Sequence, residues 1–256
     1  MLKIIVHGLG RLGRSVCELA AMGSEHKIVA GVDVTNFGDL GFPVYTDLAN
    51  CAEIADVVVD CSVAPAVSGL VSRAVAKRMP AVICTTALDD NTIRNIHTAA
   101  RDIPIFLSAN MSVGIHLMSR LSQMAAKALS GAVPGFDIEI IEKHHSGKLD
   151  APSGTANMLA GGIMDVLGGK ELIYDRSGRK QKRDAAEIGM HAIRGGSMVG
   201  EHTVLFAGNG ETLEITHNAS SREIYSQGIL RAAKLVAAKP AGLYGMDDLL
   251  AEILSP

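Results

Sequence analysis

Tryptophan is absent from this chain of 256 residues, and aromatic residues make up only 4% of it. Proteins that bind single-stranded nucleic acid stack the bases on aromatic side chains, so this scarcity argues against such a surface. The formal net charge is −3, which provides no basic surface for nucleic acid or for an anionic membrane. We therefore expect neither nucleic acid nor a membrane as a partner.

Long apolar runs and paired cysteine motifs are also missing. No apolar run reaches the roughly 20 residues of a membrane-spanning helix, and Met1 leads directly into a strand pattern rather than into a signal peptide. The four cysteines form no C-x-x-C pair. Isolated cysteines of this kind are typical of reduced thiols, so we expect a cytoplasmic protein without disulfides.

The composition that remains is that of a globular protein, with 48% hydrophobic and 20% charged residues. The length allows one large or two modest domains. In the first half, apolar strand patterns alternate with helical spacing, and we expect strands at 3–6, 27–34, 57–62, 81–84 and 103–107. This alternation predicts βαβ units and a parallel sheet, whose ligands bind at the carboxyl ends of the strands.

A glycine-rich turn follows the first of these strands. The order of strand, G-x-G-x-x-G and helix is the context of a dinucleotide fingerprint, because the glycines let the backbone approach a pyrophosphate. Asp33 ends the second strand, twenty residues after Gly13, where an acid is expected to bind ribose hydroxyls. We therefore predict an NAD-type cofactor that contacts His7, Gly8, Leu9, Gly10, Arg11, Leu12, Gly13 and Asp33.

Two further strands end in short segments at the same predicted edge of the sheet. We expect these residues to complete the cofactor site, and they are Cys84, Thr85, Thr86, Ser108, Ala109, Asn110 and Met111.

The stretch 139–156 carries the densest chemistry. It begins as a strand, becomes a polar loop with His144, His145 and Lys148, and ends where Gly154 and Thr155 open a helix. Backbone N–H groups at a helix start bind anions, so the loop suits a small anionic substrate that must also receive a proton. Loop histidines and a lone lysine are commonly just solvated, and no further ligand at i+4 spacing supports a metal site.

The remaining third favours antiparallel strands. We expect strands at 192–196, 201–206 and 211–217, with a hairpin turn at 208–210 between the last two. Residues 179–184 are interpreted as a solvated connection. A long helix over 221–238 and a short one over 247–254 are expected to finish the chain.

The stretch 142–156 closely resembles the E-x-H-H-x-x-K-x-D-x-P-S-G-T-A motif of the dihydrodipicolinate reductase family. Ten specified positions match, and they are Glu142, His144, His145, Lys148, Asp150, Pro152, Ser153, Gly154, Thr155 and Ala156. The segments 193–206 and 211–223 also match the family's pattern. Cys84 and Ala87 stand where the family has glycines, and Cys61 and Met111 where it has phenylalanines.

The resemblance implies an α/β fold in which a Rossmann-type parallel-sheet nucleotide domain, 1–111 plus 223–256, carries an inserted α+β substrate-binding and tetramerisation domain, 112–222. It implies reduction of 4-hydroxy-tetrahydrodipicolinate to tetrahydrodipicolinate with NADH or NADPH in lysine and diaminopimelate biosynthesis, by a homotetramer. His144 and Lys148 would be catalytic, while His145, Gly154 and Thr155 would bind the dicarboxylate.

Two alternatives remain open on the sequence. One is another amino-acid-pathway reductase of the same architecture, such as an aspartate dehydrogenase, and the other is a non-catalytic NAD-binding sensor. The paired histidines and the lysine argue against both. Asp33 and the absence of Lys or Arg between Lys27 and Arg73 favour NADH, with Arg11 or Arg14 as the cations that could meet a 2′-phosphate.

Overall fold

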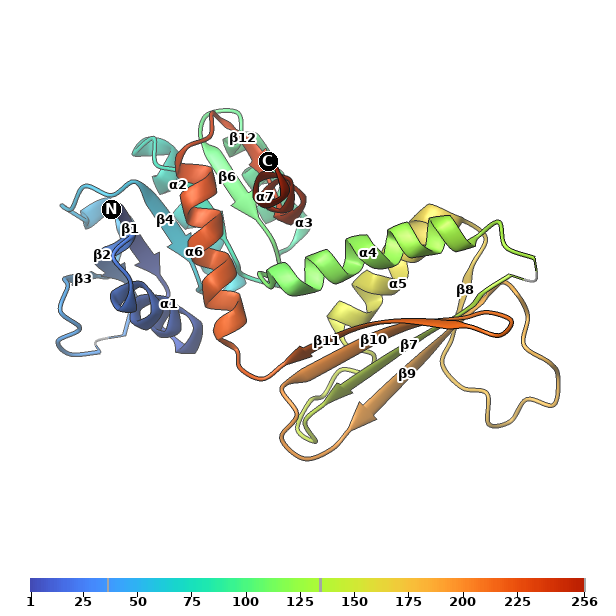
Figure 1. Ribbon diagram of the computed structural model, residues 1–256. Helices are drawn as coiled ribbons and strands as arrows, with labels where there is room; N and C mark the ends of the chain where they lie inside the picture. Colours follow the sequence, from blue (N-terminus) through green and yellow to red (C-terminus); the bar gives the residue numbers. More distant parts are fainter. Residues whose placement is uncertain (36, 134, 256) are drawn as a thin grey trace. The chain divides into compact units, whose positions relative to one another are not determined.

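The computed structural model describes residues 1–35, 37–133 and 135–255. The chain divides into two compact units (Figure 1). The first unit comprises Met1–Val113 and Glu223–Pro256, and the second comprises Gly114–Arg222. The two ends of the chain thus belong to one unit, and the second unit is an insertion between them.

In the described residues, the first unit contains a seven-stranded parallel sheet in the order β12-β6-β5-β4-β1-β2-β3. The strands are β1 Leu2–His7, β2 His26–Val32, β3 Val44–Tyr45, β4 Val57–Asp60, β5 Ala81–Ile83, β6 Pro104–Leu107 and β12 Gly242–Tyr244. This arrangement confirms the predicted Rossmann-type sheet. Sequence analysis missed β3 and β12, which are too short to show a periodic pattern.

Helices cover both faces of this sheet. They are α1 Arg11–Met22, α2 Ala64–Ala76, α3 Asp90–Ala99, α6 Glu223–Ala237 and α7 Met246–Leu254, with a short 3₁₀ helix at Leu48–Asn50. Successive strand residues serve opposite faces: Val6 packs with Ile229 of α6, whereas Ile5 packs with Val67 of α2. Burial on both faces explains the continuous apolar strands.

The described part of the second unit contains a five-stranded sheet in the order β11-β10-β7-β9-β8. Its strands are β7 Asp137–His144, β8 Glu171–Ile173, β9 Glu187–Arg194, β10 Gly200–Ala207 and β11 Thr212–Ala219, and its helices are α4 Val113–Leu129 and α5 Gly154–Leu167. Ile140 of β7 packs in one core with Met118 of α4 and Leu159 of α5. Both helices therefore contribute to the hydrophobic core of this unit (Figure 1).

This second sheet is mixed, which corrects the expectation of antiparallel strands. The β10–β11 hairpin is antiparallel, as predicted, but β7 pairs in parallel with β9. Strand β7 is also longer than expected and includes His144, which pairs with Arg194 in the register. His144 is therefore held by a strand, and the loop begins only at His145.

The interpretation of 179–184 as a solvated connection holds for residues 179–182 and 184, which are exposed, but not for Arg183. The side chain of Arg183 is only 17% exposed, and its guanidinium group donates hydrogen bonds to Asp137 (2.6 Å), Glu139 (3.1 Å) and the carbonyl oxygen of Ile138 (3.0 Å). Arg179 also pairs with Glu187 at 2.6 Å. The connection is thus anchored to β7 and β9 by ion pairs that sequence spacing cannot reveal.

We expect Arg183→Ala to lower the free energy of unfolding by about 2–4 kcal/mol, because it leaves Glu139 and two carbonyl groups with fewer donors. Lys180→Ala, at an exposed position in the same connection, is the matched control and should change it by less than about 0.5 kcal/mol. Urea unfolding monitored by circular dichroism measures both. Equal midpoints for the two variants would contradict the anchoring role.

Candidate functional site

The glycine turn after β1 is built as a dinucleotide site requires. Gly8 has φ +86°, and a Cβ atom on Gly13 would lie 1.9 Å from the carbonyl oxygen of Gly8. Gly10 precedes α1, and among the described residues no side chain caps this helix start and no acid lies in its first turn. These features fit a bound pyrophosphate, which backbone N–H groups of the first turn would hold.

Asp33 lies beside this turn, at the end of β2. Its Oδ2 atom accepts a hydrogen bond from the backbone N–H of Leu9 at 2.7 Å, and its Oδ1 atom accepts one from Thr35 at 2.8 Å. Each carboxylate oxygen can accept more than one hydrogen bond. The carboxylate is thus fixed in place and still able to bind ribose hydroxyls.

Asp60, which the sequence analysis did not assign, joins three strand ends. Its side chain is fully buried and lies 2.9 Å from His7 Nδ1, while the hydroxyl groups of Ser62 and Thr85 each donate to it at 2.6 Å. A buried carboxylate needs such donors. The sequence feature that could have indicated its role is an acid directly after the apolar run 57–59. Asp60 therefore positions His7 and Thr85, two predicted cofactor residues.

The other predicted cofactor residues lie at the carboxyl ends of β5 and β6. Cys84 is buried against Cys61, and burial followed by the hydrogen bond with Cys61 raises the pKa of its thiol, which disfavours the thiolate. The Ser108 hydroxyl donates to the carbonyl oxygen of Asn110 at 2.7 Å. Met111 is buried, and its carbonyl oxygen lies 1.7 Å from where Gly228 of α6 would carry a Cβ atom. Thr86 and Ala109 are exposed.

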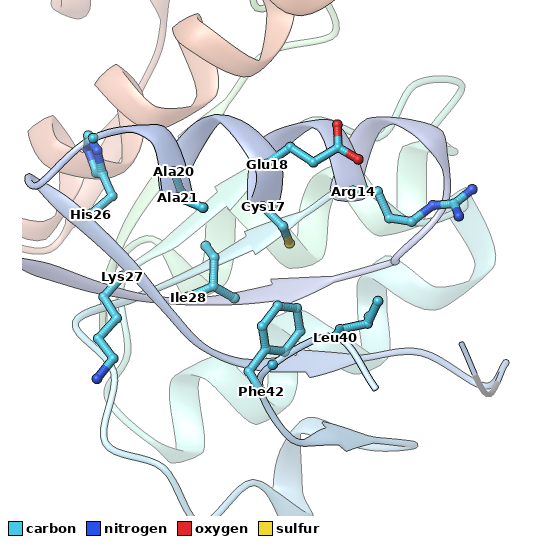
Figure 2. A pocket seen from close by; sticks show the side chains of 12 residues that line it. Arg14, Cys17, Glu18, Ala20, Ala21, His26, Lys27, Ile28, Leu40 and Phe42 are labelled. Carbon is cyan, nitrogen blue, oxygen red and sulfur yellow. The ribbon is translucent and has the colours of Figure 1, made fainter. Parts of the chain in front are cut away.

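A cavity of about 470 Å³ lies along α1 rather than at these strand ends. Figure 2 shows the Cys17 thiol, Ile28 and the Phe42 ring pointing toward one another in it. Its loop side comes from the connection between β2 and β3, whose described residues form no helix. The guanidinium of Arg14 lies over the ring of Phe37 in the same connection, 5.6 Å from its centroid. Arg14 therefore already has an interaction partner in Phe37.

The second unit holds its own buried carboxylate, Glu142 of β7. Two nitrogens of the Arg194 guanidinium donate to it at 2.7 and 2.8 Å, and the backbone N–H of Ser153 donates at 3.1 Å. Burial alone would raise the pKa of Glu142, but hydrogen bonds from Arg194 and His144 outweigh it and lower the pKa. Glu142 is thus an anion at neutral pH.

His144 is oriented by this anion. Its Nδ1 atom lies 2.5 Å from Glu142 Oε2, and its side chain is buried. Because a carboxylate only accepts hydrogen bonds, Nδ1 carries the hydrogen and Nε2 is left to exchange a proton. A Cβ atom on Gly200 would lie 3.1 Å from Nε2, so this glycine leaves room for the ring.

Lys148 is tied to the same network. Its Nζ atom pairs with Asp150 at 2.8 Å, and the hydrogen bond lowers the pKa of Asp150. The carbonyl oxygen of Asp150 accepts from Arg194 at 2.6 Å. The guanidinium group of Arg194 thus links Glu142, which contacts His144, to Asp150, which contacts Lys148. Sequence analysis matched Asp150 and Arg194 to the family pattern without giving either a role.

The predicted anion site lies at the start of α5. Ser153 caps this helix, with its hydroxyl oxygen accepting from the backbone N–H of Ala156 at 3.1 Å. Gly154 and Thr155 are the first residues of the helix, and no described acid lies in its first turn. His145 lies in the loop before it, with its carbonyl oxygen accepting from the N–H of Lys148 at 3.1 Å. A carboxylate ligand is favoured at such a terminus.

His202 of β10, another residue without an assigned role in the sequence analysis, lies against His144. The rings of His144 and His202 meet edge to face, with centroids 5.1 Å apart and an interplanar angle of 74°. Its Nε2 atom is 3.0 Å from the hydroxyl oxygen of Ser153. Burial, followed by the charge of His144, lowers the pKa of His202 to about 4, so the ring is neutral at neutral pH.

The described residues contain no helix both long and apolar enough to cross a membrane. In the same residues, no three His, Cys, Asp or Glu side chains are arranged to hold a metal ion. A parallel sheet with a glycine turn, an acid at the end of β2 and a separate basic cluster defines the class, a pyridine-nucleotide-dependent oxidoreductase.

Comparison with known proteins places the chain within this class. Residues 2–111 match the model for the N-terminus of dihydrodipicolinate reductase, and residues 114–250 match the model for its C-terminus. A 4-hydroxy-tetrahydrodipicolinate reductase from Caldanaerobacter subterraneus subsp. tengcongensis is 47% identical over 98% of each chain. The chain belongs to the dihydrodipicolinate reductase family, which confirms the resemblance seen in its sequence.

Solved structures agree at the level of fold. A dipicolinate-bound dihydrodipicolinate reductase from Paenisporosarcina sp. TG-14 has a TM-score of 0.82, with 23% identity over 97% of this chain and 99% of that chain. An aspartate dehydrogenase from Thermotoga maritima reaches 0.51, with 13% identity over 93% and 98% of the two chains. The architecture is therefore shared with the rival enzyme considered above, but the similarity is lower.

The lowered pKa of His202 predicts acid sensitivity. The unfolded chain binds a proton at this histidine near pH 6.5, whereas the folded protein does so only near pH 4. Stability is therefore full above pH 6.5 and falls as the pH drops toward 4, by about 3 kcal/mol in total from this group. Urea unfolding from pH 7.5 to 4.5 measures the slope.

The control for this prediction is His202→Gln, which removes the titrating group but leaves His26 and His217, whose pKa values are also lowered by burial. The variant should lose less stability than the native chain over the same pH range. Parallel curves for the two proteins would assign the acid sensitivity elsewhere.

Proposed function

We propose that this protein reduces 4-hydroxy-tetrahydrodipicolinate, or the dihydrodipicolinate derived from it, to tetrahydrodipicolinate with NADH or NADPH, in the cytoplasm, as a step of lysine and diaminopimelate biosynthesis. The observation that carries this proposal is the placement of His144. It is held by Glu142 within one network that also contains Lys148 and the cap of α5. A proton donor and an anion site together match the needs of a dicarboxylate that is reduced and protonated.

The substrate would be held by its carboxylates. The start of α5, with Gly154 and Thr155, suits one carboxylate, and the hydrogen-bond donors of His145 and Lys148 suit the other. The reductase from Paenisporosarcina sp. TG-14 described above binds dipicolinate, a flat aromatic dicarboxylate. That ligand supports a small dianion as the substrate class for this chain.

The protein's own contribution is orientation and proton transfer. Bound reduced nicotinamide supplies the hydride. Lys148, which pairs with Asp150, would donate a proton to the reduced ring, and His144 would act as acid and base through Nε2. Glu142 keeps the hydrogen on Nδ1, and Arg194 keeps Glu142 ionised.

Replacing either proposed catalytic residue should cut turnover strongly. We expect His144→Ala and Lys148→Ala to lower kcat by roughly 10²–10⁴ while NADH still binds, because general acid–base groups contribute about this much. Activity with synthase-generated substrate measures turnover, and nucleotide fluorescence measures binding. His97→Ala, at an exposed position on α3, is the control.

Near-native turnover in both variants would remove these residues from the mechanism. Turnover of oxaloacetate with ammonia in place of the heterocyclic substrate would instead favour the aspartate dehydrogenase alternative. NADH binding without any turnover would favour the sensor.

For the cofactor, we propose that NADH is at least as good as NADPH. Asp33 is an anion fixed beside the glycine turn, where it repels a 2′-phosphate, and Arg14 is engaged by Phe37. We expect kcat/KM with NADH to equal or exceed that with NADPH, measured at low and high salt. A tenfold preference for NADPH would contradict this, and its loss in either Arg11→Ala or Arg14→Ala would identify the phosphate partner.

We further propose a homotetramer joined through the sheet of the second unit. Ile193 of β9 is 44% exposed, and Ile141 of β7 and Leu205 of β10, on the same face of this sheet, are only partly buried. Apolar strand residues that face solvent in one copy are typical of an interface. Static light scattering should give four times the chain mass of 26.8 kDa. A monomer mass at micromolar concentration would overturn the proposal.

A further inference from the structure

Glu142, Ser153 and His202 form a closed network of contacts with the proposed acid–base histidine, His144. Glu142 contacts His144 through Oε2 at 2.5 Å and the backbone N–H of Ser153 through Oε1 at 3.1 Å. Ser153 contacts His202 Nε2 through its hydroxyl oxygen at 3.0 Å, and the His202 ring returns to the His144 ring at 5.1 Å. This network thus joins His144 to Ser153, the cap of α5, by two routes. One runs through the anion of Glu142 and the other through the neutral imidazole of His202.

His202 is rigidly held in this network of contacts. Its backbone pairs with Glu142 of β7 on one side and with His217 of β11 on the other. Its side chain is 4% exposed, so it has little freedom to turn. A rigid side chain on a central strand is the kind of support that fixes a neighbouring functional group.

We infer that His202 is a positioning residue that fixes the acid–base ring of His144 relative to the Ser153 cap, and through it relative to the start of α5. This inference rests on the proposed function, since it gives His202 a role only if His144 exchanges a proton with a substrate bound at α5. His202 itself touches neither substrate nor cofactor in this scheme.

The chemistry of Ser153 explains why an imidazole is needed. The hydroxyl oxygen of Ser153 must keep a lone pair on the N–H of Ala156 to cap the helix. A partner at Nε2 of His202 holds the hydroxyl in that rotamer, whereas a leucine would fill the volume and leave the hydroxyl without this partner. Glutamine places an amide near the position of Nε2 and can keep the hydrogen bond, although it lacks the aromatic edge.

His202→Leu and His202→Gln therefore separate volume from hydrogen bonding. We expect His202→Leu to bind pyridine-2,6-dicarboxylate about tenfold or more weakly, and to lower kcat further, while the dissociation constant for NADH stays unchanged. His202→Gln should restore dicarboxylate binding to within about threefold of the native value but only part of kcat, because the edge contact with His144 is missing. Calorimetry and steady-state kinetics measure these values.

Imidazole ¹⁵N chemical shifts of His144 provide a readout that does not depend on activity. They should move in His202→Leu without any ligand, because the ring loses its neighbour. A double-mutant cycle with Ser153→Ala keeps the test decisive if His202→Leu folds poorly. The pair His202→Asn and Ser153→Ala should then show non-additive losses of dicarboxylate affinity, because asparagine is too short to reach Ser153 and both changes therefore remove the same hydrogen bond.

The outcomes separate the inference from the proposed function. If the native chain neither binds the dicarboxylate nor turns over the substrate, the proposed function fails. If the native chain does both and His202→Leu binds the dicarboxylate equally well with unchanged His144 shifts, the inference is overturned. Additive losses in the cycle would overturn it as well, because they would mean that Ser153 and His202 act separately.

Discussion

The pairing of Glu142 with Arg194 is the interaction on which the second unit depends. Glu142 lies on the face of β7 that otherwise carries Ile138 and Ile140 into the core, and an unpaired anion there would be destabilising by several kcal/mol. The fork of the guanidinium satisfies both carboxylate oxygens. This pairing requires β9 to run parallel to β7, because that register places Arg194 opposite His144, beside the carboxylate. The parallel pairing of β7 with β9 therefore determines both the sheet topology and the geometry of the site.

The first unit repeats this arrangement with Asp60. Each unit buries one carboxylate at the carboxyl end of a central strand, and each carboxylate contacts the Nδ1 atom of a histidine, His7 or His144. A buried anion costs stability, but its directional hydrogen bonds orient side chains that would otherwise choose among rotamers. The difference lies in the compensating charge. Glu142 has the permanent cation of Arg194, whereas Asp60 is satisfied by His7 and two hydroxyl groups.

Sequence patterns predicted the local features well and the distant pairings poorly. The strand, glycine turn and helix up to Met22 follow from residues that are neighbours in the chain, and so does the strand that Asp33 ends. The roles of Asp60 and His202 depend on partners that lie 25 to 58 residues away, such as Thr85, Ser153 and His144. The anchoring of Arg183 could not be predicted for the same reason, because its partner Asp137 lies 46 residues away in the chain. Nothing in one sequence records which polar residues will meet across a sheet.

One missed relationship was nonetheless within reach of the sequence. Side chains of a strand alternate between its faces, so Ile138, Ile140, Glu142 and His144 share one face if β7 is extended by three residues beyond its apolar part. That extension predicts a carboxylate beside His144 on the buried face. It also separates the two adjacent histidines: His144 ends the strand on the buried face, whereas His145 begins the loop. Their adjacency in the chain therefore does not give them one role, and the strand's periodicity explains why only His144 is held by a buried acid.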